Sequence, residues 1–264
     1  MLLAIDIGNS TLKMGVFNGS ADKLVCNFSI SALTSRTADE YTVLIKQMLL
    51  ERNISAFPKN AVISSVVPSL TSVLSDACRN ICHNTPFIIG TGTKTGFPIK
   101  IDVQSQLGAD MVSNAAASFS FAKPPFVVVD LGTATTVTAV NSLGQLIGTV
   151  IAPGASVSLN ALERSAALLT DISFTKPDAV IGKNSQDSIR SGAYWGHVVM
   201  VDGFIDRIRS ELCEDGESLS VIGTGGLCEK LLPACKNPIF VVPDLTLIGA
   251  ASLFYLNTAG HRGK

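Results

Sequence analysis

Two short segments of the sequence combine a carboxylate, a glycine and hydroxyl side chains, a set of groups that can bind phosphate. The first reads DIGNST at residues 6–11, and the second reads DLGTAT at residues 130–135. A phosphate chain needs backbone N–H donors at close range, hydroxyl donors, and a carboxylate for the magnesium that screens its charge. Gly8 and Gly132 have no Cβ and would let a phosphate approach the backbone, and Lys13 could add a positive charge. An Asp-x-Gly turn can also do no more than close a hairpin, and Lys13 can be a solvated lysine.

The residues that flank the two segments repeat as well. Each segment follows an apolar run typical of a short strand and precedes two more strand-like runs joined by a glycine turn. Asp130 follows Asp6 by 124 residues, and the same spacing aligns Gly8 with Gly132 and Thr11 with Thr135. A repeat of this kind favours two similar lobes over one sheet. We expect lobes at residues 1–125 and 126–264, with both turns gripping one nucleotide.

A third glycine-rich segment, GTGG at residues 223–226, lies between an expected strand and an expected helix. Such a glycine run suits contact with a flat base or ribose. The sequence contains no Gly-x4-Gly-Lys-[Ser/Thr] P-loop that would compete for the nucleotide. The sequence therefore predicts a nucleotide site built on the paired turns.

The elements that must position these turns alternate between strands and helices, which is typical of an α/β fold. Thr37 and Glu40 have the spacing of a capping box, and the apolar stripe that follows them predicts a helix. Pro68 is expected to begin another helix directly after a buried strand. Further helices are expected at residues 104–122, 155–168, 186–214 and 245–256, and further strands at 61–67 and 220–222.

A phosphotransferase also needs a carboxylate that orients the attacking hydroxyl and takes its proton. Asp110 is the candidate, and Asn114 lies one helical turn further on the same face. An aspartate near a helix start can instead simply stabilise the helix dipole. The sequence alone leaves both roles open for Asp110.

Composition and charge exclude several other classes of protein. With 47% hydrophobic and 16% charged residues, the chain is not a disordered one. Its net charge of −1 provides no global field for nucleic acid or anionic membrane. The first residues resemble no secretory signal and no apolar run is long enough to span a bilayer, so we expect a cytoplasmic protein. The six cysteines lack metal-ligand spacing and are expected to be reduced thiols.

Together these segments resemble the type III pantothenate kinases, members of the acetate and sugar kinase, heat-shock protein 70 and actin superfamily. The resemblance extends over nearly the whole chain. Besides the two turns, it rests on GAD at residues 108–110, IAPG at 151–154, IGKNS at 181–185, SG at 191–192 and TGG at 224–226. It implies an α/β fold of two ribonuclease-H-like (actin-like) lobes, with mixed sheets flanked by helices.

The resemblance also implies ATP-dependent phosphorylation of the primary hydroxyl of pantothenate, the entry step to coenzyme A, by a homodimer. It implies Mg²⁺ with ATP, a monovalent cation (K⁺ or NH₄⁺) at Asp130, and Asp110 as the proton acceptor. The implied ATP contacts are Asp6, Ile7, Gly8, Asn9, Ser10, Thr11, Leu12, Lys13 and Thr133. The implied pantothenate contacts are Ile101, Gly108, Ala109, Asp110, Met111 and Ser185.

Two positions depart from the family pattern, and both are on the pantothenate side. Met111 stands where the family has an arginine, and Ile101 stands where it usually has a tyrosine. Ser185 replaces a usual threonine but keeps the hydroxyl. We therefore expect intact ATP binding and a weak hold on the acceptor. Two alternatives stay open: a kinase for another small hydroxyl acceptor, and a non-catalytic nucleotide-binding regulator of the same fold.

Overall fold

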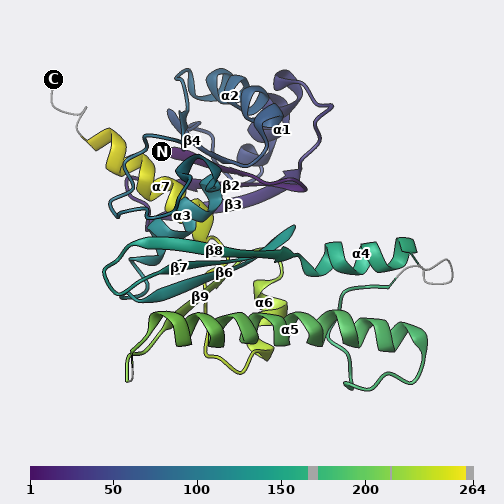
Figure 1. The fold of residues 1–264 in the computed structure, drawn as a ribbon. Coiled ribbons are helices and arrows are strands. Elements are labelled where there is room, and N and C mark those ends of the chain that lie inside the picture. The colour runs from purple at the N-terminus through teal and green to yellow at the C-terminus, as the bar shows by residue number, and fades with distance from the viewer. Residues whose placement is uncertain (166–171, 215, 260–264) are drawn as a thin grey trace. The chain divides into compact units, whose positions relative to one another are not determined.

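The computed structural model describes residues 1–165, 172–214 and 216–259. The chain forms two compact units (Figure 1). The first unit comprises residues 1–98, residues 102–118 and the chain from Leu245 onward, and the second comprises residues 99–101 and 119–244. Each unit contains one five-stranded sheet with both parallel and antiparallel neighbours.

The first sheet has the strand order β3-β2-β1-β4-β5. Its strands are β1 (Leu2–Ile7), β2 (Thr11–Phe17), β3 (Leu24–Ser31), β4 (Asn60–Ser65) and β5 (Phe87–Ile88). β1 pairs antiparallel with β2 and parallel with β4. Since β4 and β5 are also parallel, the carboxyl ends of β1, β4 and β5 lie at one edge of this sheet.

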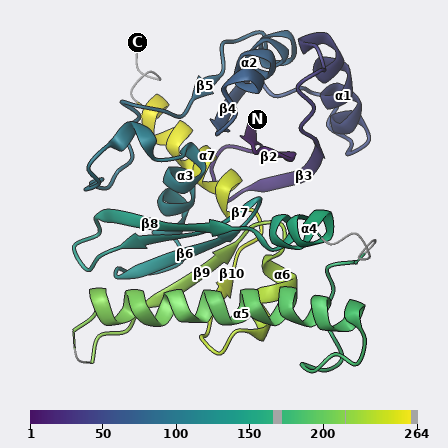
Figure 2. The same ribbon diagram turned by 45° about the vertical axis from the view of Figure 1, so that its right-hand side comes forward.

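Helices cover both faces of the first sheet. They are α1 (Ala38–Leu50), α2 (Pro68–Cys82), α3 (Ala109–Ser118) and α7 (Leu245–Thr258), with a 3₁₀ turn at Gln104–Gln106. Ile5 and Ile63 of the sheet share a core with Ile45 of α1 and Leu74 of α2. The opposite face packs on α3 and α7, which lie side by side in Figures 1 and 2.

The expected capping box at the start of α1 is confirmed. The Thr37 side chain accepts a hydrogen bond from the Glu40 amide, and the Glu40 carboxylate accepts one from the Thr37 amide. Pro68 is the first residue of α2, as expected. Both helix starts were thus readable from local sequence, because the groups involved lie within one turn of each other.

The second sheet has the order β10-β9-β6-β7-β8. Its strands are β6 (Phe126–Leu131), β7 (Ala134–Val140), β8 (Leu146–Pro153), β9 (Ser220–Thr224) and β10 (Phe240–Val241). The helices of this unit are α4 (Ala155–Ser165), α5 (Ser185–Leu212) and α6 (Cys228–Leu231), followed by a 3₁₀ turn at Leu232–Ala234. Val127 and Val129 of β6 pack with Val198 and Val201 of α5.

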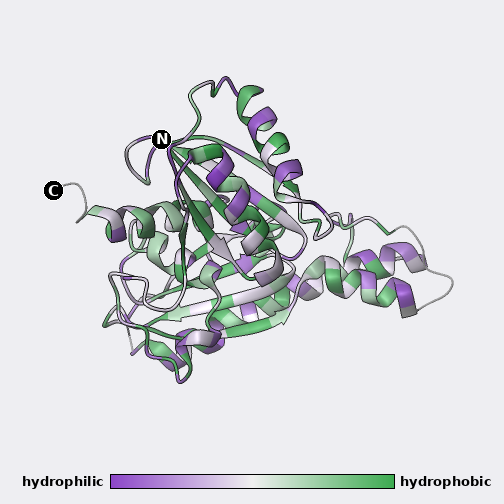
Figure 3. Cartoon of the chain, turned by 90° about the horizontal axis from the view of Figure 1, so that it is seen from above, coloured by the Kyte–Doolittle hydropathy of each residue, from purple (hydrophilic) through white to green (hydrophobic). Residues whose placement is uncertain are grey.

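Hydropathy follows this layering within each unit. In Figure 3 the strands are largely hydrophobic, whereas the helices alternate between hydrophilic and hydrophobic residues. Such alternation is expected of helices that pack one side on a sheet and expose the other. Among the described residues, no helix is both long and apolar enough to cross a membrane. All six cysteines, which lie within the described residues, are free.

The division of the chain differs from the expected lobes at residues 1–125 and 126–264. α7 belongs to the first unit, because it packs closely on α3. A Cβ on Gly249 of α7 would overlap the backbone of Ser113, so only glycine permits this approach. The boundary in the middle of the chain falls after Ser118, where α3 ends.

The expected helix at residues 104–122 is also wrong in extent. Residues 104–106 form a 3₁₀ turn, Leu107 is extended, and α3 runs only from Ala109 to Ser118. The break coincides with Gly108, which lies against Val66. The expected helix at 155–168 begins as predicted, and its last three residues lie outside the described ones.

Candidate active site

The first phosphate-type turn joins β1 to β2 at the carboxyl edge of the first sheet. The Gly8 amide closes the turn by donating to the Thr11 carbonyl at 3.1 Å. The Ser10 carbonyl accepts from the Ala32 amide at 3.1 Å, which fixes the turn to the chain after β3. Asn9 at the tip of the turn is exposed. The turn is therefore anchored at its base and accessible at its tip.

Three polar residues at this edge share one face of the sheet. Asp6 on β1 pairs with Lys13 on β2 and with Ser64 on β4. Paired residues of adjacent strands point to the same face, so the carboxylate, the ammonium and the hydroxyl lie together. The Ser64 hydroxyl is fully buried and makes no hydrogen bond within the described residues. A buried donor without a partner is uncommon in folded proteins and marks a polar position that a ligand could satisfy.

Asp110 lies in the first turn of α3, close to the carboxyl end of β4. A side chain on Gly108 would overlap Asp110 Oδ1 and would stand 3.5 Å from Val66 Cγ1. The carboxylate accepts a hydrogen bond from the Met111 amide at 2.8 Å. Burial raises the pKa of Asp110 above its ordinary value, and hydrogen bonds from backbone amides oppose that rise. Gly108 thus leaves room for a partly buried carboxylate beside β4.

Asn114, one helical turn after Asp110, makes a buried contact between two helices. It is 2% exposed, and its Oδ1 accepts a hydrogen bond from the Thr246 hydroxyl at 2.8 Å. Thr246 belongs to α7, so this buried bond ties α3 to the last helix of the chain. Asn114 therefore supports the helix that carries Asp110.

The second phosphate-type turn is shorter than the first by one residue. Three residues separate β1 from β2, whereas two separate β6 from β7. The Gly132 amide accordingly donates to the Ala134 carbonyl at 3.0 Å, where Gly8 donates to Thr11. The counterpart of Thr11 is therefore Ala134, and the expected match with Thr135 is wrong by one residue. Thr135 is 1% exposed, so it is not available to a ligand at the surface.

Two glycines pack directly on the second turn. A Cβ on Gly154 would overlap the carbonyl oxygens of Gly132 and Thr133. A Cβ on Gly225 would overlap the Leu131 amide nitrogen, and Gly225 also has φ +97°, a conformation that L-residues rarely adopt. Both positions therefore require glycine, because the backbone approaches too closely for any side chain.

The surroundings of Asp130 fit a hard cation. A Cβ on Gly225 would stand 2.6 Å from Asp130 Oδ1, so the Gly225 backbone packs closely on the carboxylate. Thr136 is the cross-strand partner of Asp130, and its hydroxyl shares the carboxylate's face. Carboxylate, hydroxyl and backbone carbonyl oxygens suit K⁺ or Mg²⁺ better than a soft metal. Within the described residues, no group of three His, Cys, Asp or Glu side chains forms a metal site.

The remaining predicted residues lie at several places. Ser185 is the first residue of α5, is exposed, and follows the helix cap Asn184. Met111 is 9% exposed in α3, and Ala109 is also buried. Ile101 is half-buried and belongs to the second unit. The structure thus groups the residues of the first turn with Asp110, Gly108 and Met111 in one unit, and Asp130, Thr133, Ile101 and Ser185 in the other.

Sequence reasoning missed several residues of these sites. Ser64 has no motif of its own, and only strand register places it beside Asp6; Thr136 directly follows the second turn, but its position opposite Asp130 is likewise given only by register. Gly154 and Gly225 belong to the IAPG and TGG motifs, so the sequence already marked these two positions. The close packing on the second turn that these glycines allow is visible only in the structure.

Comparison with known proteins identifies one family. Residues 2–207 match the sequence pattern described as type III pantothenate kinase. Type III pantothenate kinase from Pelobacter propionicus is 40% identical over 258 residues, covering 97% of this chain and 100% of that protein. The protein of the same name from Myxococcus xanthus is 38% identical over 260 residues, covering 98% of this chain and 100% of that protein.

Solved structures share the fold at lower identity. A Baf family transcriptional activator from Campylobacter jejuni aligns with a TM-score of 0.59 and 17% identity over 97% of this chain and 99% of that chain. A ROK family glucokinase from Streptomyces griseus, in complex with glucose and AMPPNP, aligns with a TM-score of 0.56 and 11% identity over 96% of this chain and 98% of that chain. The expected α/β fold of two mixed sheets flanked by helices is confirmed. Because the family pattern covers most of its length and relatives reach 40% identity end to end, this chain belongs to the type III pantothenate kinase family.

Proposed function

We propose that this chain transfers the γ-phosphoryl group of ATP to the primary hydroxyl of pantothenate, giving 4′-phosphopantothenate, the first step of coenzyme A biosynthesis. Family membership over nearly the whole chain supports the reaction. The observation that supports the site is the partly buried carboxylate of Asp110, held beside the carboxyl end of β4 in the unit that contains the first turn.

Asp110 acts as the proton acceptor. The acceptor hydroxyl donates its hydrogen bond to the carboxylate, and the proton moves to Asp110 as the oxygen bonds to the γ-phosphorus and the bond to the β-phosphate oxygen breaks. Burial raises the pKa of Asp110, which makes the carboxylate a better base than an exposed one. The Met111 amide keeps the carboxylate oriented by its hydrogen bond of 2.8 Å.

The ATP contacts follow the first turn and the start of the second. Backbone amides and hydroxyls of residues 6–12 bind the phosphates, Lys13 adds positive charge from the face of Asp6, and Thr133 supplies a further contact. The divalent metal that accompanies ATP neutralises phosphate charge. Asp130 would hold the monovalent cation, K⁺ or NH₄⁺, which would supply positive charge for the phosphates.

The residues proposed to contact the acceptor include two that depart from the family pattern, Met111 and Ile101. Gly108 and Ala109 shape the start of α3, and the Ser185 hydroxyl is exposed for a hydrogen bond. Met111 and Ile101 offer apolar contact only. In this proposal the chain works as a homodimer in the cytoplasm.

The experiment is an assay of ATP turnover with pantothenate, with and without K⁺, and with the product identified by mass. Formation of 4′-phosphopantothenate that increases with K⁺ is the expected result. Turnover with a different small alcohol but not pantothenate would indicate another acceptor. ATP binding without any phosphorylation would instead favour the non-catalytic regulator.

A further inference from the structure

His197, a buried residue of α5, takes no part in the roles described above. Its side chain is 7% exposed. Nδ1 of the ring lies 3.0 Å from the carbonyl oxygen of Ala193, one turn earlier on the same helix. Nε2 lies 3.3 Å from the carbonyl oxygen of Pro153, the last residue of β8. The imidazole thus joins α5 to the end of a strand from a distant part of the chain.

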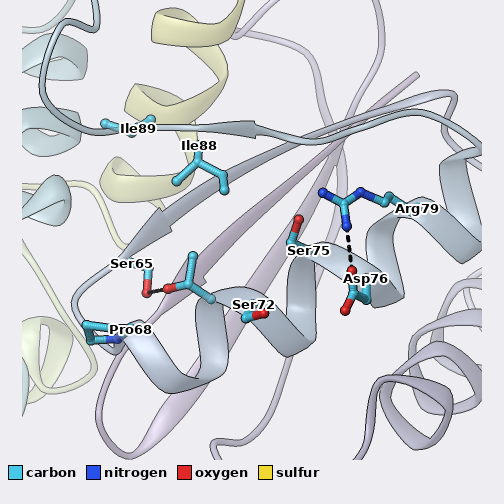
Figure 4. A pocket seen from close by; sticks show the side chains of 9 residues that line it. Ser65, Pro68, Ser72, Ser75, Asp76, Arg79, Ile88 and Ile89 are labelled. Atoms are coloured by element: carbon cyan, nitrogen blue, oxygen red, sulfur yellow. Dashed lines mark hydrogen bonds and ion pairs between the residues drawn. The ribbon is translucent and has the colours of Figure 1, made fainter.

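Both nitrogens of this ring face hydrogen-bond acceptors. A neutral imidazole has one N–H donor, whereas an imidazolium has two. A neutral His197 can therefore bond only one of the two carbonyls, and its other nitrogen then turns a lone pair toward an oxygen. Within the described residues His197 has no carboxylate partner. By contrast, Arg79 pairs with the Asp76 carboxylate at 2.5 Å in the groove shown in Figure 4.

Few ionisable groups lie near the ring of His197. β7 and β8 contain none, and Tyr194 is the one such residue within four positions on α5. Burial raises the pKa of Tyr194, and its hydroxyl donates to the Lys230 carbonyl at 2.9 Å. The charged residues of the described helices α4 and α6, which also pack on α5, are Glu163, Arg164, Glu229 and Lys230. The first two lie about 12 Å or more along α4 from its start, and the last two are exposed.

The Pro153 carbonyl belongs to a peptide group that also contacts the second phosphate-type turn. This carbonyl and the Gly154 amide are parts of one planar unit. The Gly154 amide donates to the Thr133 carbonyl at 3.1 Å. His197 therefore contacts one side of a peptide group whose other side bonds the turn, and hydrogen bonds in such a chain strengthen one another. Because a Cβ on Gly154 would overlap the Thr133 carbonyl, this peptide group cannot rotate without disturbing the turn.

We propose that His197 is a positioning residue for the second turn, whose Nε2–H holds the Pro153–Gly154 peptide group in the orientation that bonds Thr133. The inference rests on the proposed function, in which Thr133 contacts ATP. The ring lies closer to Ala193 than to Pro153, so a neutral ring that donates from Nδ1 leaves Pro153 without its bond. The protonated ring makes both bonds. Nucleotide binding should therefore weaken as the pH rises through the range in which histidine loses its proton.

The test measures binding of AMPPNP, an ATP analogue that is not hydrolysed, by calorimetry. His197→Phe keeps a ring without a donor and is expected to weaken binding about three- to tenfold, because one hydrogen bond is lost. His197→Gln keeps an N–H near the position of Nε2 and should restore most of the affinity. Between about pH 6 and pH 8 the wild type should lose affinity, whereas His197→Gln should not. Equal affinity of the wild type and His197→Phe would overturn the inference.

Val198→Ala is the matched control for a general loss of stability. Val198 is the next residue of α5, is 4% exposed, and packs in the core of the second unit. The variant should lower the melting temperature while changing AMPPNP affinity less than about twofold. If it weakened binding as much as His197→Phe does, the role of His197 would be structural and the inference would fail.

Amide hydrogen exchange at Gly154 tests the contact without any assay of activity. The amide should exchange faster in His197→Phe than in the wild type, because its bond to Thr133 opens more often. Unchanged exchange would show that His197 does not hold this peptide group.

These measurements also separate the inference from the proposed function. If the wild type binds AMPPNP but does not phosphorylate pantothenate, and His197→Phe weakens that binding, the positioning role is confirmed and the kinase assignment fails. If the wild type phosphorylates pantothenate and His197→Phe changes neither AMPPNP affinity nor exchange at Gly154, only the positioning role fails. Absence of AMPPNP binding to the wild type would overturn both.

Discussion

The turn after β1 and the turn after β6 have the same topology but different charge. In each sheet the strand before the turn pairs antiparallel with the strand after it and parallel with a third strand. Lys13 lies opposite Asp6 in the first turn, whereas Thr136 lies opposite Asp130 in the second. One copy thus combines a carboxylate with an ammonium group, and the other combines a carboxylate with a hydroxyl.

From this difference we propose that the two hairpins have different binding roles. In the first copy Lys13 lies opposite Asp6 on the same face, and we propose that its ammonium group attracts phosphate. In the second copy the residue opposite the carboxylate is the neutral Thr136, and we propose that Asp130 binds a cation. In this proposal the two hairpins share their strand pairing, and one cross-strand residue sets the charge of the ligand that each binds.

The largest expected effect is at Asp110, the proposed proton acceptor, which belongs to the first unit. Asp110→Asn keeps the shape of the side chain but removes the proton acceptor, so kcat should fall by about 10²–10⁴-fold with ATP affinity nearly unchanged. Single-turnover kinetics and nucleotide binding measure the two quantities. If the variant kept more than about half of the wild-type turnover, Asp110 would be only a helix-dipole residue.

Exchanging the cross-strand residues tests the division of roles directly. Lys13→Met should raise the KM for ATP by about tenfold or more, since a charge-assisted contact to phosphate is lost. Thr136→Lys should place an ammonium group beside Asp130 and reduce activation by K⁺ without abolishing turnover. Steady-state kinetics across a K⁺ series measures both. Equal K⁺ activation in the wild type and Thr136→Lys would show that Asp130 does not bind the cation.

Gly225→Ala should damage the second turn alone. The Cβ would overlap the Leu131 amide nitrogen at a φ of +97°, which costs about 1–3 kcal/mol of strain. We expect a roughly tenfold higher K⁺ requirement and a lower melting temperature. Gly226→Ala is the matched control, because a Cβ there meets no atom within 4 Å. If the two variants behaved alike, the close packing of Gly225 on the second turn would not be needed for cation activation.

The smallest effect concerns pH. Burial raises the pKa of Asp110, so the carboxylate takes up a proton at a higher pH than an exposed aspartate does. A protonated Asp110 cannot accept the proton of the acceptor hydroxyl. The value of kcat/KM for pantothenate should therefore fall as pH decreases, and the fall should begin above the ordinary aspartate range. ATP binding measured over the same pH range is the control, and an equal fall in ATP binding would assign the titration elsewhere.

Local sequence determined the features whose parts lie close together in the chain. The two Asp-x-Gly turns, the capping box of Thr37 and Glu40, and the helix start at Pro68 all involve residues within a few positions of each other. The order of several motifs was enough to indicate the family, which the comparisons confirm. Asp110 could be named as a candidate from its motif, but its function stays a prediction.

Only the tertiary structure decided which distant residues complete each site. Strand register placed Ser64 beside Asp6 and made Ala134 the counterpart of Thr11, because the two turns differ in length by one residue. Because α7 packs on α3, the chain from Leu245 onward belongs to the first unit. Asn114 stabilises this contact through its hydrogen bond with Thr246. These outcomes depend on pairing and packing between segments far apart in the sequence, and no local pattern of residue types encodes such contacts.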